Sequence, residues 1–246
     1  MHEDLVLDRT YTQGDSGGKV SLIQEWLWLN GLGVNVDGDF GPATAAAMKK
    51  FKQRRKLPPN STVDKQTFDQ LVAPMRAVLK PIPANGRSLG QLAVAYGQQH
   101  YRSRPREVGG PNRGPWVRLY MNWEGKKAYW CAGFACFILQ QAADTLKVKL
   151  PFASSQGCRD IADSARQHHV FLGSPGPEAR KRIKPGSLFL EEGGDTGYQH
   201  TGIVVQAKPD FMLTIEGNTN SGGSNNGFEV LPRHRGYGAV DFALLN

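Results

Sequence analysis

Residues 130–146 read WCAGFACFILQQAADTL, and this stretch decides the fold of the larger part of the chain. Its apolar residues recur at spacings of three and four, which predicts an amphipathic helix. Cys131 stands at the start of that helix, where free N–H groups and the positive end of the helix dipole lower the pKa of a thiol. A cysteine nucleophile is therefore expected here. Cys136 and Cys158 are interpreted instead as small buried apolar residues.

Beyond this helix the hydrophobic pattern shortens to brief apolar runs. Five runs predict strands, joined by connections short enough to imply antiparallel pairing. Before the helix, Ser88 can cap another one, and a further helix is expected within residues 155–169. Helices followed by a sheet of about five strands indicate an α+β domain. The predicted strands cover residues 187–190, 200–205, 211–216, 228–231 and 240–244.

The region before residue 72 has a different pattern. Apolar residues at helical spacing predict one helix that ends at the glycines near residue 31. Residues 37–42 read DGDFGP, a tight loop that leads into a second helix with Pro42 at its first position. Asp64 can cap a third. Three short helices are thus predicted in about sixty residues, a small module of its own.

Residues 73–87 contain three prolines and a glycine and are interpreted as an inter-domain linker. The predicted organisation is a first domain at residues 1–72, this linker, and a second domain at residues 88–246.

Composition limits the possible classes. The chain has 246 residues and a formal net charge of +8, which suits an anionic cell wall and nucleic acid equally well. No apolar stretch has the roughly 20 residues of a membrane span, and residues 1–11 lack the apolar core of a secretory signal. Three cysteines without a Cys-x-x-Cys pair argue against a disulfide framework and a structural zinc site.

A thiol nucleophile needs a base and a group that orients the base. Among the six histidines, His200 opens an apolar strand, where a polar residue is unusual unless it faces a cleft. Glu216 and Asn218 end the next strand two residues apart, so in an extended chain they face the same side. Either can accept a hydrogen bond from the imidazole of His200.

The first module resembles the three-helix peptidoglycan-binding domain of cell-wall hydrolases. The resemblance covers about 60 residues and rests on the DGDFGPAT motif at residues 37–44, with Gln24, Phe51 and Leu71 around it. It implies peptidoglycan as the partner, with Asp37 and Phe40 as candidate substrate contacts. A requirement of the turn itself is the alternative explanation for Asp37.

The second domain resembles the CHAP family of papain-like cysteine amidases and peptidases. Its motifs are EVGGPNRG at residues 107–114, WCAGF at 130–134, KPGSL at 184–188, HTGIV at 200–204 and TIEGNT at 214–219. The resemblance implies that Cys131 is the nucleophile, His200 the general base, Glu216 the orienting acid and Asn218 a fourth site member. Some members bind calcium before the cysteine. Residues 124–127 read EGKK here, so neither a metal nor another cofactor is expected.

A papain-like site also implies a substrate groove. Trp116, Trp130 and Tyr198 are candidates to line it, and packing in the core is the alternative for each.

Together these features predict a peptidoglycan hydrolase that cuts an amide bond, either between muramic acid and L-alanine or within the stem or cross-bridge peptide. A non-catalytic wall-binding protein with a degenerate hydrolase domain is the alternative. A nucleic-acid-binding protein is a third interpretation, resting on charge alone, and nucleic acid is not the expected partner.

The expected setting follows from the missing signal. We expect synthesis in the cytoplasm and action in the periplasm or wall, after delivery through holin pores as a phage endolysin or by a type VI secretion system as an antibacterial effector. An effector would have a cognate immunity protein as a second partner. The chain is expected to be a monomer.

Overall fold

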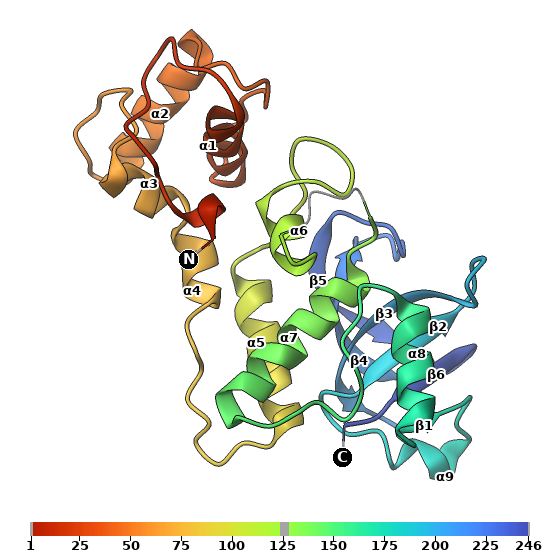
Figure 1. Ribbon diagram of the computed structural model, residues 1–246. Helices are drawn as coiled ribbons and strands as arrows, with labels where there is room; N and C mark the ends of the chain where they lie inside the picture. The colour runs from red at the N-terminus through yellow and green to blue at the C-terminus, as the bar shows by residue number, and fades with distance from the viewer. Residues whose placement is uncertain (1, 124–127, 246) are drawn as a thin grey trace. The chain divides into compact units, whose positions relative to one another are not determined.

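The structure is a computed structural model that describes residues 2–123 and 128–245 (Figure 1). The chain forms two compact units. The N-terminal unit comprises Met1–Lys80 together with Arg106–Arg118, and the C-terminal unit comprises Pro81–Pro105 together with Leu119–Asn246. Each is described by itself below.

The N-terminal unit is helical, as predicted. The short helix η1 precedes three longer ones, α1, α2 and α3, and a two-turn helix α4. Pro42 occupies the first turn of α2, where its missing N–H has no helical partner to lose. Asp64 caps α3 by accepting a hydrogen bond from the Thr67 N–H at 2.8 Å. The bounds are η1 Glu3–Leu5, α1 Gly18–Leu29, α2 Pro42–Arg54, α3 Lys65–Leu71 and α4 Ala73–Val78.

Helix α4 corrects the predicted linker, because Ala73–Val78 is helical and buries Met75 and Val78. Pro74 lies in its first turn, the one helical position that proline favours, so this proline did not mark a break.

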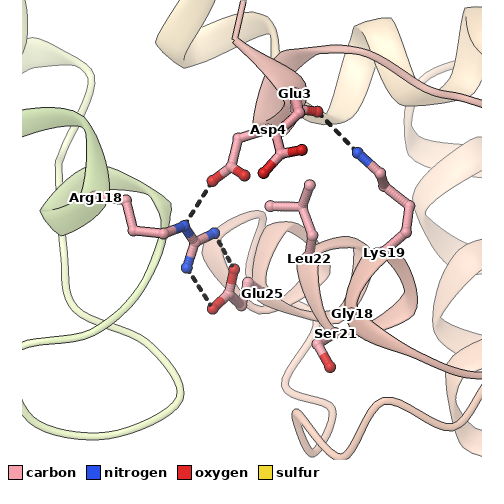
Figure 2. A pocket seen from close by; sticks show the side chains of 8 residues that line it. All are labelled: Glu3, Asp4, Gly18, Lys19, Ser21, Leu22, Glu25 and Arg118. Atoms are coloured by element: carbon pink, nitrogen blue, oxygen red, sulfur yellow. Dashed lines mark hydrogen bonds and ion pairs between the residues drawn. The ribbon is translucent and has the colours of Figure 1, made fainter. Parts of the chain in front are cut away.

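Residues 106–118 belong to the N-terminal unit, although the sequence placed them in the second domain. The indole of Trp116 meets that of Trp26 edge to face, with ring centroids 6.1 Å apart. Arg118 forms two hydrogen bonds with Glu25, at 3.1 and 2.7 Å, and one with Asp4 at 2.6 Å (Figure 2). These contacts join residues 106–118 to the N-terminal unit. They link residues far apart in the sequence, so no local pattern could predict them.

The described part of the C-terminal unit contributes four further helices, and α6 (Pro115–Tyr120) spans its boundary with the segment above. Ser88 caps α5 with a complete capping box, since its side chain accepts from the Gln91 N–H and Gln91 reciprocates. The predicted helices over 131–146 and within 155–169 are both present. The bounds are α5 Leu89–Arg102, α7 Cys131–Leu146, α8 Cys158–Gln167 and α9 Pro177–Arg180.

A fully antiparallel sheet forms the rest of this unit. Within the described residues it has six strands in the order β1-β6-β2-β3-β4-β5. The five predicted strands correspond to β2–β6, and the two-residue β1, which pairs with β6, is the strand that sequence missed. The bounds are β1 Phe171–Leu172, β2 Leu188–Glu192, β3 Tyr198–Ala207, β4 Met212–Thr219, β5 Glu229–Arg235 and β6 Val240–Ala243.

Helices α5 and α7 pack against β3 and β4, and α8 packs against β3 and β6 (Figure 1). The first turn of α7 packs tightly against the backbone of Tyr120. A Cβ at Gly133 would lie 2.5 Å from the carbonyl oxygen of Tyr120, so only glycine permits this approach. Trp130 stacks on the Tyr120 ring at 5.5 Å. Among the described helices, none combines the length and apolar character that crossing a bilayer requires.

Candidate active site

Cys131 is the first residue of α7, as the sequence predicted. Its N–H and those of the next residues have no partner inside the helix, so this end carries a partial positive charge. The residue is only 2% exposed, yet it lines a cavity of about 700 Å³ in the C-terminal unit. A buried thiol at the wall of a cavity can meet a substrate without facing bulk water.

His200 on β3 and Glu216 on β4 are both fully buried. The Nε2 atom of His200 lies 2.9 Å from Oε2 of Glu216. That bond occupies one ring nitrogen, and the other, Nδ1, is buried and has no hydrogen-bond partner among the described residues. Cys131, His200 and Glu216, the three residues that the sequence proposed for the site, thus lie on α7, β3 and β4, which pack against one another.

The surroundings of Cys131 favour its thiolate. A hydrogen bond from the thiol of Cys158 contributes most to lowering the pKa of Cys131. Burial works in the opposite direction, but the neighbouring imidazolium of His200 and the Thr201 N–H also lower that pKa, which ends well below its ordinary value.

The pKa values of His200 and Glu216 shift in the directions that keep both groups charged. Burial tends to lower the pKa of His200, but the neighbouring thiolate of Cys131 and the hydrogen bond to Glu216 outweigh it and raise the pKa to about 9. Burial tends to raise the pKa of Glu216, but hydrogen bonds from Arg235 and His200 bring it to about 2. These directions favour a thiolate on Cys131, an imidazolium on His200 and a carboxylate on Glu216.

Gly202 explains how the carboxylate reaches the imidazole. A Cβ at this position would lie 2.7 Å from Cγ of Glu216, 2.9 Å from the Phe189 ring and 3.0 Å from the backbone oxygen of Ile215. The glycine of the HTGIV motif therefore leaves the space over β3 in which the Glu216 side chain lies.

Of the two residues that the sequence left open as the orienting group, Glu216 is the one bonded to His200. Asn218 has φ of +56°, and the pairing of β4 with β5 shifts between Glu216 and Thr219. The chain is therefore not extended at Asn218, and the condition on which positions 216 and 218 were expected to face the same side is not met. The buried side chain of Asn218 has no hydrogen-bond partner among the described residues.

Cys158, interpreted from sequence as an ordinary buried cysteine, has a different environment. It is the first residue of α8, lines the same cavity as Cys131, and its sulfur lies 3.9 Å from that of Cys131. The thiolate of Cys131 and burial both raise the pKa of Cys158, so it stays protonated and donates. Its place at a helix start was the available signal. Cys136 is structural, as expected, with a pKa that burial raises to about 11.

The predicted aromatic lining is correct for one residue of three. Tyr198 lines the cavity. Trp116 and Trp130 do not, because both are buried in the core, Trp116 against Trp26 and Trp130 against Tyr120. The exposed aromatic at the cavity is Tyr129, which is 59% exposed.

Uncharged polar groups supply much of the remaining wall of the cavity. Amide and hydroxyl side chains of this kind can donate to and accept from amides and sugar hydroxyls. Among the described residues they are Gln156, Thr196, Gln199, Ser224, Asn225 and Asn226.

In the N-terminal unit, the DGDFGPAT motif is organised by Gln24, which is fully buried. Its amide nitrogen donates to Asp37 Oδ1 at 2.7 Å, and its carbonyl oxygen accepts from the Gly38 N–H at 2.8 Å. The carboxylate of Asp37 is thus engaged within the loop, in line with the turn explanation. Phe40 is 1% exposed, so its expected contact with substrate is corrected to a role in the core.

No group of three or more His, Cys, Asp or Glu side chains within residues 2–123 and 128–245 is arranged to hold a metal ion. The expectation drawn from residues 124–127 lies outside the described residues.

Comparison with known proteins identifies the first module. Residues 16–71 match the family described as a putative peptidoglycan binding domain. The solved structure of the SleB N-terminal domain is 31% identical over 27% of this chain and 93% of that one, with a TM-score of 0.27. No curated protein matches. The N-terminal unit thus contains a putative peptidoglycan-binding domain, and peptidoglycan is the partner that the match supports.

Proposed function

We propose that this protein is a cysteine-dependent peptidoglycan hydrolase of CHAP type that cleaves an amide bond of the polymer. The observation that carries the proposal is the buried arrangement of Cys131 at the start of α7, His200 on β3 and Glu216 bonded to His200 at 2.9 Å. A carboxylate that orients an imidazole beside a low-pKa thiol is the machinery of acyl transfer to sulfur.

In the proposed reaction the thiolate of Cys131 attacks the amide carbon. The N–H groups at the start of α7 stabilise the negative charge on the oxygen. The imidazolium of His200 gives its proton to the leaving nitrogen, the C–N bond breaks, and a thioester remains on Cys131. A water molecule, deprotonated by His200, hydrolyses the thioester and restores the thiolate.

The substrate class is supported by the first module. A putative peptidoglycan-binding domain on the same chain concentrates the catalytic unit on that polymer. The amide and hydroxyl side chains around the cavity suit a neutral glycopeptide. The bond is either that between muramic acid and L-alanine or one within the stem or cross-bridge peptide.

We further propose a lytic role, as a phage endolysin or as an antibacterial effector injected by a secretion system and neutralised in the producer by an immunity protein. Action on the wall from the periplasmic side belongs to this proposal.

The test is mass spectrometry of the muropeptides released from purified sacculi. New ends are expected with the wild-type protein and none with Cys131→Ala, which should fold and still bind sacculi. Cys136→Ala is the matched control, because it removes a thiol of the same helix that does not line the cavity, and it should keep activity.

A Cys131→Ala variant with full activity would refute the nucleophile. A wild-type protein that binds sacculi but releases nothing would favour a non-catalytic wall-binding protein.

A further inference from the structure

Arg235, at the end of β5, lies between two carboxylates. Its Nε and Nη2 atoms bond the two oxygens of Glu216, each at 2.7 Å, and its Nη1 bonds Oε2 of Glu191 at 2.6 Å. The side chain is 16% exposed, so these contacts are only weakly screened by water. A two-point bond of this kind uses the planar fork of arginine, which lysine lacks.

The Arg235 contacts complete the surroundings of Glu216. This carboxylate also accepts from His200 Nε2 at 2.9 Å and from Thr214 Oγ1 at 2.6 Å. With donors on both oxygens and no exposure to solvent, the carboxylate stays ionised and cannot rotate without breaking hydrogen bonds.

Glu191 on β2 connects Arg235 to the cavity. Its Oε1 accepts from Asn225 Nδ2 at 2.9 Å and from Gln199 Nε2 at 3.1 Å, and both of these side chains line the cavity beside Cys131. A continuous chain of hydrogen bonds therefore runs from the cavity wall to the imidazole of His200.

We propose that Arg235 is a positioning residue of the site, which holds Glu216 ionised and aimed at His200 and joins that carboxylate to the cavity wall through Glu191. The inference rests on the proposed function, because positioning matters only if Cys131 and His200 act as nucleophile and base.

A pH profile separates this role from a purely structural one. The titratable groups around Glu216 are His200 on β3, Arg235 on β5, Glu191 on β2 and, beyond the imidazole, Cys131 with Cys158. Arg235 is the cation that contacts Glu216 most directly, so its removal should move the pKa of Glu216 from about 2 toward its ordinary 4.5. Protonated Glu216 no longer supports the imidazolium, so the thiolate of Cys131 should be lost at a higher pH than in the wild type.

Removal of the Glu191 charge should have the opposite effect on the pKa of Glu216. Glu191 is a like charge that competes with Glu216 for the guanidinium, so Glu191→Gln should leave the acidic midpoint unchanged or lower it. A general loss of stability would move both variants the same way.

The experiment measures the rate of Cys131 alkylation by iodoacetamide against pH in the full chain, for the wild type, Arg235→Gln, Arg235→Lys, Glu191→Gln and the exposed control Arg182→Gln. We expect a higher acidic midpoint of alkylation for Arg235→Gln and the wild-type midpoint for Arg182→Gln. For Arg235→Lys we expect a midpoint between those of Arg235→Gln and the wild type. On sacculi, Arg235→Gln should lower kcat by about tenfold or more with little change in KM, as expected for lost orientation.

An Arg235→Gln variant with the wild-type alkylation profile would overturn the inference, as would equal shifts for Arg235→Gln and Glu191→Gln. If Arg235→Gln fails to fold, Arg235→Lys and Glu191→Gln still decide it, because the acidic midpoint should rise in Arg235→Lys and should not rise in Glu191→Gln. Because alkylation needs no substrate, the two failures differ: a wild type that releases no muropeptides but shows the expected profiles would refute the hydrolase, and an active wild type without those profiles would refute the positioning role.

Discussion

The sulfur atoms of Cys131 and Cys158 lie 3.9 Å apart on the wall of one cavity. Since the pKa of Cys158 is raised and that of Cys131 is lowered, the proton stays on Cys158 and the pair behaves as a thiol that donates to a thiolate. Cys158→Ala removes that donor, so the pKa of Cys131 should rise and its alkylation should begin at a higher pH. Cys136→Ala is the control. Identical profiles for the two variants would argue against the donor role.

The alkaline limit of hydrolysis should lie near pH 9. The leaving nitrogen needs the proton of the His200 imidazolium, and the pKa of His200 is raised to about 9 by the neighbouring Cys131 thiolate and the hydrogen bond to Glu216, despite its burial. Activity on sacculi should therefore persist through neutral pH and fall as His200 loses its proton. The check is kcat between pH 6 and 11. A fall centred near the ordinary value of 6.5 would mean that Glu216 and Cys131 do not stabilise the imidazolium.

Gly202→Ala should disable the site without touching a reacting atom. The added methyl group would lie 2.7 Å from Cγ of Glu216 and 3.0 Å from a backbone oxygen, so the carboxylate must move away from His200. Overpacking of this kind costs about 1–3 kcal/mol of unfolding free energy. A displacement of about 1 Å at a catalytic group lowers kcat by about 100-fold.

Gly236→Ala is the matched control for Gly202→Ala, because a Cβ there would meet nothing within 4 Å. Unfolding curves and turnover of sacculi should show no loss for it. Equal activity of the two variants would mean that Glu216 has room that the structure does not show.

Gln24→Ala should weaken the attachment to the wall. Gln24 holds both Asp37 and the Gly38 N–H from a fully buried position, and its loss leaves buried polar groups without partners. Each such group costs about 1–3 kcal/mol. Co-sedimentation with sacculi should fall, whereas alkylation of Cys131 should stay as in the wild type. Gln53→Ala, at an exposed position of α2, should bind normally.

Local patterns were enough to predict the helix that begins at Cys131, the cap at Asp64 and the strand that carries His200, although β3 begins two residues earlier, at Tyr198. Such features depend on neighbouring residues, through helical spacing, strand runs and capping. The motif at residues 37–44 likewise predicted the peptidoglycan-binding module that the family match supports.

The rest depended on contacts between distant segments. Arg235 and Glu191 are 44 positions apart, and a charged residue at a strand end gives no sign of its partner. The left-handed backbone of Asn218 gave no sign in the strand pattern, and Trp116 and Trp130 were assigned to a groove because aromatic bulk suits a groove as well as a core.

The path of the chain limits how this protein can be taken apart. It passes from one unit to the other after Lys80, again after Pro105 and again after Arg118. A single cut in the proline-rich stretch would remove Trp26 and Glu25 from the chain. Trp116 and Arg118 would stay on the remaining fragment without these partners. Exchange of the wall-binding module by recombination at one junction should therefore yield insoluble chimaeras, unless residues 106–118 are exchanged with it.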